Sequence, residues 1–154
     1  MITRRLFIGG AAALGPLLLA PKLADAATGH KALTADEVLA LASVVAGEAR
    51  GQPLRGQHAV VCVVLNRVRS RSATFAKDVD IVAACTRPHQ FHPLRHSPYP
   101  VSAALVHEAY DNWVRGQDPS RAATAFLDVN DHPYWARRLR PVAVIGGHRF
   151  FKVA

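Results

Sequence analysis

The sequence contains few of the features on which several large classes of enzymes depend. It has only two cysteines among 154 residues, and they do not form a Cys-x-x-Cys pair. It also has no Gly-rich phosphate loop and no nucleophile-elbow serine, so nucleotide and thiol chemistry have no support. Beyond the first 26 residues, no apolar run reaches the ~18 to 20 residues that a membrane-spanning helix needs. We therefore expect no stable membrane span once the N-terminal segment is removed.

The N-terminal segment has the parts of an export signal. It begins with a pair of arginines, continues with an apolar run to Ala20, and ends at a small-x-small cleavage sequence, Ala-Asp-Ala. The arginine pair is typical of twin-arginine signals, although ordinary export signals share it. We expect residues 1–26 to be a signal peptide, residues 27–33 a linker, and residues 34–154 one domain. The exported protein would then act in the periplasm or cell envelope.

Acidic residues are scarce relative to basic ones, 11 against 19 in the whole chain. Loss of the predicted signal removes Arg4, Arg5, Lys22 and Asp25 and leaves a net charge near +6. A basic exported protein favours anionic partners, among which cell-wall polymers are more plausible than nucleic acid in that compartment. A positive surface that only aids solubility is the alternative.

The two cysteines, Cys62 and Cys85, permit one disulfide in an oxidising compartment. The alternative is a small buried thiol at Cys62, which lies within the apolar sequence AVVCVVL.

The N-terminal part of the domain is predicted to be helical. Thr34 and Glu37 have the spacing of a capping box, and a helix over residues 35–50 follows, with apolar residues at helical spacing. Gly51 and Pro53 end it. The next apolar segment, GQHAVVCVVLNRVRSR, has strand-like composition and also fits a helical stripe, but its length of about 16 residues favours a buried helix.

The rest of the chain is predicted to contain a loop, a helix and a hairpin. Residues 73–100 are rich in proline, histidine and arginine and indicate an ordered surface loop. Helical spacing returns over residues 101–116, where Trp113 is expected to face the core. Gly146 and Gly147 separate two short runs of strand character, which predicts a β-hairpin. The fold class is therefore α+β, mostly helical with a small β element.

Glu48 is the residue on which a functional interpretation depends. It lies in VAGEARGQP, at the edge of the apolar stripe and in the last turn of the predicted helix. A solvated surface charge is the simplest explanation. However, the flanking glycines permit close approach of a ligand, and apolar surroundings favour the protonated carboxyl that a general acid requires. Arg50 would act in the opposite direction, because a nearby cation favours the carboxylate.

Three segments in this order resemble the cell wall hydrolase family that includes the spore cortex-lytic enzymes. They are LASVVAGEARGQPLRGQHAVVCVVLNRVRS, then PHQF, then PYWARRLRPVAVIGGHRFF, and together they span about residues 35 to 152. The resemblance implies a fold similar to goose-type lysozymes and lytic transglycosylases. It also implies cleavage of peptidoglycan glycan strands between N-acetylmuramic acid and N-acetylglucosamine, and the catalytic glutamate of the family falls on Glu48.

The same resemblance supplies the other site residues. Candidate substrate contacts are Arg50, Asn66, Gln90, Phe91, Tyr134 and Trp135. Asn66 follows an apolar run, and a buried amide there must be hydrogen-bonded; orienting the loop of Glu48 is one way to satisfy it. No second carboxylate lies in the matched motifs, and Asp78, Asp80, Glu108 and Asp111 cannot be placed from sequence. A one-carboxylate mechanism, as in lytic transglycosylases, is therefore an alternative to hydrolysis by two carboxylates.

Two departures from the family pattern concern the predicted activity. Gln52 stands where many members have a second glutamate, and TAFL, which ends in Phe126 and Leu127, stands where many have a sequence such as THYH. These departures motivate an alternative interpretation, a non-catalytic peptidoglycan-binding or accessory protein that keeps the fold. A nucleic-acid binder is a third interpretation, which rests on charge alone.

His89, His92 and His96 lie in one predicted loop and are candidate metal ligands. The prolines between them prevent the i, i+4 presentation of a helical metal site, so we expect a glycan-facing loop and no metal or cofactor. We expect the protein to act as a monomer on peptidoglycan glycan strands.

Overall fold

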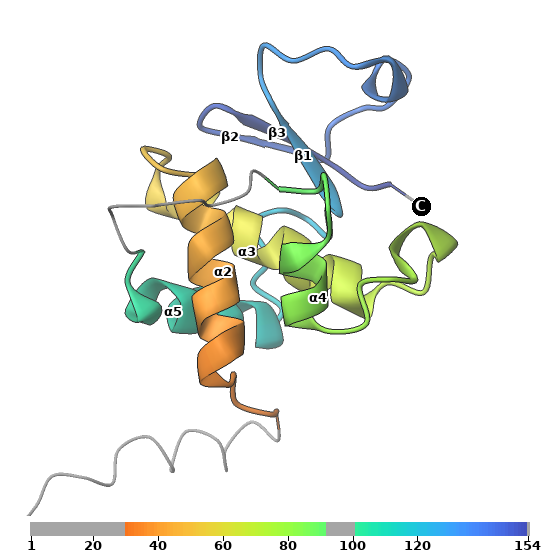
Figure 1. Cartoon of the computed structure of the whole chain (residues 1–154). Helices are drawn as coiled ribbons and strands as arrows, with labels where there is room; N and C mark the ends of the chain where they lie inside the picture. The colour runs from red at the N-terminus through yellow and green to blue at the C-terminus, as the bar shows by residue number, and fades with distance from the viewer. Residues whose placement is uncertain (1–29, 92–100, 154) are drawn as a thin grey trace, which may run out of the picture. The chain divides into compact units, whose positions relative to one another are not determined.

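Helix α3 (Leu54–Arg69) is the central element of the fold. The structure is a computed structural model, which describes residues 30–91 and 101–153. The predicted signal peptide, residues 27–29 of the predicted linker, and His92 and His96 lie outside the described residues. Every residue from His58 to Arg67 is buried, and α3 packs against α2, α4, α5 and strand β1 (Figure 1). The apolar residues 59–65 cover every side of the middle of this helix, and such a segment belongs in the interior, as its length predicted.

Helix α2 (Ala35–Glu48) begins where the sequence predicts and ends two residues before the predicted end at residue 50. The capping box is present, because the backbone N–H of Glu37 donates to Thr34 Oγ1 and the N–H of Thr34 donates to a carboxylate oxygen of Glu37, at 3.3 and 2.7 Å. Glu48 is the last helical residue. Gly51 follows with a φ of +80°, in the left-handed region that favours glycine, and Pro53 is the N-cap of α3.

The prediction of a loop over residues 73–100 is wrong for part of this range. A 3₁₀ turn, η1 (Ala73–Phe75), and a short helix, α4 (Ile81–Thr86), lie within it. Asp80 caps α4 by accepting a hydrogen bond from the N–H of Ala83 at 2.7 Å, and the helix packs on α2 and α3. Six residues are too few for helical periodicity to be recognised, so the capping aspartate was the only local signal.

Helix α5 (Ala103–Val114) confirms the prediction of a helix over residues 101–116. Ser102 caps its start, and Gly116 follows its end with a φ of +79°. Trp113 packs against the core.

The sheet has three antiparallel strands in the order β1-β3-β2. Strands β2 (Ala143–Ile145) and β3 (His148–Phe151) are the predicted hairpin, and β1 (Ala125–Asp128) was not predicted. Phe126 of β1 lies opposite Phe150 of β3. Because side chains alternate along a strand, His148 and Phe150 share one face of the sheet with Phe126, whereas Phe151 is on the other face. Figure 1 shows the sheet at one end of the helical layer.

Cys62 and Cys85 are free thiols, so the disulfide does not form in this structure. Burial raises the pKa of Cys85 to about 12 and raises that of Cys62 further. Within the described residues, no helix is both long enough and apolar enough to cross a membrane.

Candidate active site

Glu48 lies at the junction between α2 and the turn that leads into α3. Its side chain is half-buried, between the exposed Gly47 and the fully buried Ala49. The turn is closed by two backbone hydrogen bonds, from the N–H of Ala49 to the carbonyl of Val45 and from the N–H of Gln52 to the carbonyl of Ala49. This placement combines partial desolvation of the carboxyl group with access from solvent.

Two buried basic side chains lie within electrostatic range of Glu48. Burial lowers the pKa of His148 below its usual range, while Asp128 and Glu48 act in the opposite direction. Burial also lowers the pKa of Arg67, and Glu48 is among the acids that oppose this shift. His148 is therefore neutral at neutral pH, whereas an arginine remains charged. The described site thus contains the Glu48 carboxyl group, one fixed cation and one neutral imidazole, and Asp128 is a second acid that acts on the imidazole.

Arg67 is held rigidly at the back of this site. It is 6% exposed, its Nε donates to the carbonyl of Thr124 at 2.6 Å, and a terminal nitrogen donates to Gln90 Oε1 at 3.3 Å. The guanidinium also lies over the ring of Phe91, 4.8 Å from its centroid. Arg67 therefore joins α3 to the start of β1 and to the predicted substrate contacts Gln90 and Phe91.

Aromatic rings form a wall beside Arg67. Phe126 stacks with Phe91 at 6.4 Å and contacts the His148 ring at 5.1 Å and Phe150 at 5.9 Å between ring centroids. The Nδ1 atom of His148 is buried without a hydrogen-bond partner. The wall brings the PHQF segment, strand β1 and strand β3 together, although they are far apart in sequence.

Gln52 fixes the hairpin to the turn that follows Glu48. Its Oε1 accepts a hydrogen bond from the N–H of Gly147 at 2.8 Å. Gly146 has a φ of +56°, and a Cβ atom there would lie 2.8 Å from Pro53 Cδ and closer still to the Gln52 amide. Only glycine fits this approach, so the start of β3, which carries His148, is held against the turn beyond Glu48.

Asn66 is satisfied by contacts on another side of α3. Its Nδ2 donates to Asp118 Oδ2 at 2.9 Å and to the carbonyl of Ala123 at 3.0 Å, and its Oδ1 accepts from Trp113 Nε1 at 2.9 Å. The expectation of a hydrogen-bonded buried amide is confirmed. However, these bonds order residues 118–123 and not the turn after Glu48.

Tyr134 and Trp135 lie in η2 (Tyr134–Ala136), between β1 and β2. They are 78% and 44% exposed, and the ring of Trp135 meets Phe151 edge-on at 5.8 Å. Because Phe151 and His148 are on opposite faces of the sheet, the contact with Phe151 places Trp135 on the face away from His148. Arg50 is exposed, two residues beyond Glu48.

The other acids considered from sequence have separate roles. Asp78 is buried and forms a salt bridge with Arg87 at 3.1 Å, Asp80 caps α4, and Glu108 and Asp111 are exposed on α5. Asp128, which no sequence pattern singled out, lies opposite His148 across the β1–β3 pair and is the second acid that acts on that histidine.

Arg67 and His148 are the site residues that sequence reasoning missed. Each lies inside a quoted family motif, VLNRV and IGGHRFF, and each is a basic residue in a segment predicted to be a buried helix or a strand. The signal was therefore present, namely a polar side chain where a buried element was expected. In the described part of the chain, no group of three histidine, cysteine or acidic side chains is placed to hold a metal ion.

Known proteins resemble this chain in both sequence and structure. The family model described as Cell Wall Hydrolase matches residues 51–151, which begins just after Glu48. The catalytic domain of the Bacillus cereus SleB protein matches with a TM-score of 0.65 and 25% identity over 82% of this chain and 97% of that one. The catalytic domain of the germination-specific lytic transglycosylase SleB from Bacillus anthracis matches with the same TM-score and 26% identity, over 80% and 99%.

A curated relative, the spore cortex-lytic enzyme of Halalkalibacterium halodurans, is 33% identical over 122 residues. The match covers 75% of this chain but 34% of the relative, so the chain spans about a third of that protein's length. The fold is that of the SleB catalytic domains, which is lysozyme-like, as the sequence resemblance implied. The chain belongs to the cell wall hydrolase family.

Proposed function

We propose that this protein cleaves the glycan strands of peptidoglycan, with Glu48 as the general acid and then the general base. The observation that carries the proposal is the position of Glu48. It is a half-buried carboxyl at a helix end, within electrostatic range of the buried Arg67 and His148, in the fold of SleB catalytic domains. Family membership supports the substrate class.

The chemistry requires Glu48 to exchange one proton in each direction. The protonated carboxyl donates its proton to the glycosidic oxygen as the bond to C1 of muramic acid breaks. The resulting carboxylate then accepts a proton from the group that attacks C1. If that group is the C6 hydroxyl of the same sugar, the product is an anhydro-muramyl end. If it is water, the product is a reducing end.

Arg67 and His148 are compatible with both the protonated and the ionised state of Glu48 that this chemistry requires. The fixed charge of Arg67 stabilises the carboxylate that forms when the proton is transferred. The neutral ring of His148 adds no second positive charge to the site. Phe91 and Phe126 pack against Arg67 and His148 respectively, so both basic side chains are held in a partly apolar surrounding, where charges interact more strongly than in water.

The proposed location is outside the cytoplasm, in the periplasm or cell envelope, where peptidoglycan is accessible. The export signal predicted over residues 1–26 supports this part of the proposal.

The test is mass spectrometry of the soluble products released from purified sacculi. The wild-type protein is compared with Glu48→Gln and with a control, Asp111→Asn, which removes an exposed acid on α5. We expect fragments from the wild type and the control and a loss of at least about 10²-fold in Glu48→Gln. Anhydro-muramyl ends identify the C6 hydroxyl as acceptor, and reducing ends identify water. Full activity of Glu48→Gln would refute the assignment.

A non-catalytic peptidoglycan-binding protein is the second candidate. The observation in its favour is Phe126, which fills the wall beside His148 where many family members have a tyrosine. This candidate predicts that the wild-type protein pellets with sacculi but releases no soluble fragments.

A further inference from the structure

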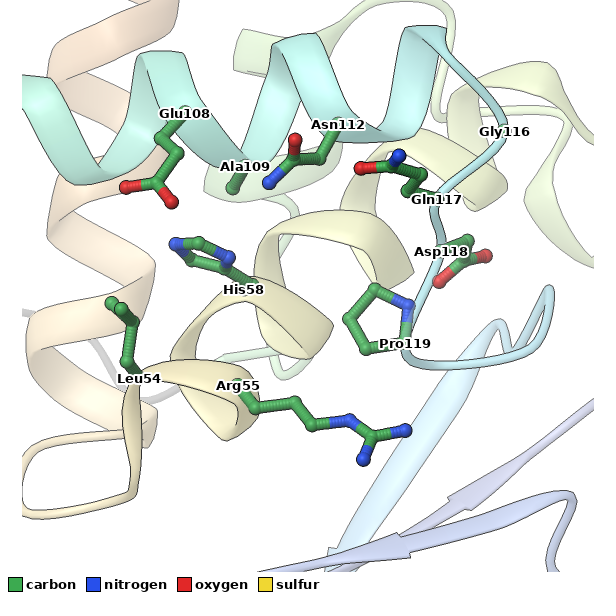
Figure 2. A pocket seen from close by; sticks show the side chains of 10 residues that line it. All are labelled: Leu54, Arg55, His58, Glu108, Ala109, Asn112, Gly116, Gln117, Asp118 and Pro119. Carbon is green, nitrogen blue, oxygen red and sulfur yellow. The ribbon is translucent and has the colours of Figure 1, made fainter.

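A second pocket lies between the first half of α3 and the last half of α5. It has a volume of about 530 Å³ and is lined by Arg55 and His58 from α3, Glu108 and Asn112 from α5, and the turn that contains Gln117 (Figure 2). Leu54, Ala109 and Pro119 supply its apolar surface. None of these residues belongs to the site around Glu48.

The buried histidine of this pocket lacks a hydrogen-bond partner. His58 is 8% exposed, and its Nε2 is buried without a partner. Figure 2 shows the ring extending from α3 toward α5, on the side of Glu108. Buried polar groups in folded proteins nearly always have partners, so this nitrogen is open to a hydrogen bond that the described chain does not supply.

Opposite charges lie on the two sides of this histidine. Figure 2 shows Glu108 and Arg55 on opposite sides of the His58 ring. Both side chains are exposed, and neither has an ion-pair partner in the described part of the chain. They are therefore available to one ligand that carries both a cationic and an anionic group.

The other polar side chains of the pocket, those of Asp118 and Asn112, do not suit the binding of a simple ion. Burial alone would raise the pKa of Asp118, but hydrogen bonds from Ser120, Asn66 and Ala122 outweigh it and hold that pKa low. Its carboxylate is thus already saturated by the protein. Asn112 Oδ1 accepts from Arg115 at 2.7 Å, which leaves its amide nitrogen to donate to a ligand carbonyl. Amide donors between opposite charges match a peptide that has a free amine and a free carboxylate.

We infer that the pocket formed by Arg55, His58, Glu108 and Asn112 binds the peptide side chain of peptidoglycan. Arg55 contacts a peptide carboxylate, Glu108 contacts the amine, and His58 and Asn112 bind the peptide amides. The inference rests on the proposed function for its substrate, because peptidoglycan combines a glycan strand with peptides that carry both charges. The site would favour peptides that are not cross-linked, because a cross-link uses up the free amine and a carboxylate.

Binding can be tested without cleavage. The probe is a synthetic stem tetrapeptide with its free amine and carboxylates, titrated into the Glu48→Gln protein while the NMR signals of the His58 ring are followed. We expect the His58 signals to shift, and Arg55→Gln and Glu108→Gln each to weaken binding about tenfold. The control variants Arg71→Gln and Asp111→Asn remove exposed charges outside the pocket and should leave the affinity unchanged. A titration that leaves His58 unmoved, or equal affinities in all variants, would overturn the inference.

Cleavage assays separate this inference from the proposed function. On intact sacculi, Arg55→Gln and Glu108→Gln should be several-fold slower than wild type, while on glycan strands stripped of peptide all three should be equal. Equal losses on both substrates would show that the variants only disturb the fold and would overturn the inference. If instead Glu48→Gln keeps full activity, the proposed catalytic role of Glu48 fails, while the peptide titration still shows whether the pocket binds the peptide.

Discussion

Removal of the Gln52 side chain tests how the candidate active site is held together. In Gln52→Ala, the N–H of Gly147 loses its 2.8 Å hydrogen bond to Oε1, which is the link between the turn after Glu48 and the hairpin. A hydrogen bond of this kind contributes about 1 kcal/mol to the free energy of unfolding. For a domain of this size we expect the melting temperature to fall by about 3 to 5 °C.

The expected effect on activity is larger than the effect on stability. The lost contact lets β3, and with it His148, move relative to Glu48, and displacements of about 1 Å can reduce enzyme rates by up to ~10²-fold. Gln52→Glu keeps an oxygen that accepts from Gly147, so it should retain nearly wild-type stability and activity. The same reasoning explains how this chain can have glutamine at position 52, where many family members have glutamate, because both side chains offer an acceptor oxygen to the N–H of Gly147.

The measurements are thermal unfolding by circular dichroism and the rate of fragment release from sacculi, for both variants and the wild type. Gln52→Ala with unchanged melting temperature and rate would refute the reasoning, because the hydrogen bond would then hold nothing in place. A Gln52→Glu protein as damaged as Gln52→Ala would also refute it, since the two differ in whether the acceptor remains.

Three further predictions concern backbone, pH and thiols. Gly146→Ala should lower the free energy of unfolding by more than about 2 kcal/mol, because the added Cβ atom meets Gln52 and Pro53. Gly116→Ala, the control, should lower it by only the ~1 to 2 kcal/mol of a left-handed alanine, since nothing lies near that Cβ position. Urea titration measures both values, and equal losses would contradict the close approach at Gly146. Because burial lowers the pKa of His148, the unfolded chain binds a proton there more readily, so the stability of the folded protein should decrease as the pH falls below about 6.5. His148→Phe should flatten this part of the plot of melting temperature against pH. An identical plot for the variant would argue against burial of His148 as the cause. Cys62 and Cys85 should react with a thiol reagent at pH 8 only after unfolding, because burial raises both pKa values; rapid reaction of the folded protein would show that they are accessible.

Local sequence signals predicted the helices because their physical causes are local. The capping box of Thr34 and Glu37 and the apolar stripe behind it lie within one segment, so the start of α2 was predicted correctly and its end to within two residues. The hairpin was equally accessible, since Gly146 and Gly147 mark its turn. Strand β1 has no such mark, because its four residues become a strand only when β3, at least twenty residues further along the chain, pairs with them.

The candidate site was only partly predictable, because its contacts join segments that are far apart in sequence. A buried amide at Asn66 had to be hydrogen-bonded, but its partners at residues 118–123 come from 52 to 57 positions later. Likewise, the spacing of Tyr134 and Trp135 gives no indication of which face of the sheet their loop covers. Proximity to Glu48 was therefore predictable for its chain neighbours and not for His148.

Arg67 shows why the separate family motifs are needed together. Its side chain leaves the buried helix and bonds to Thr124 and Gln90, so the NRV motif of α3 reaches the TAFL and PHQF segments directly. A lysine could keep the charge but has no planar group to donate in two directions while lying over Phe91. The guanidinium can therefore hold the aromatic wall and the cation beside Glu48 in one arrangement. The proposed catalytic position of Glu48 depends on that arrangement as much as on its own helix.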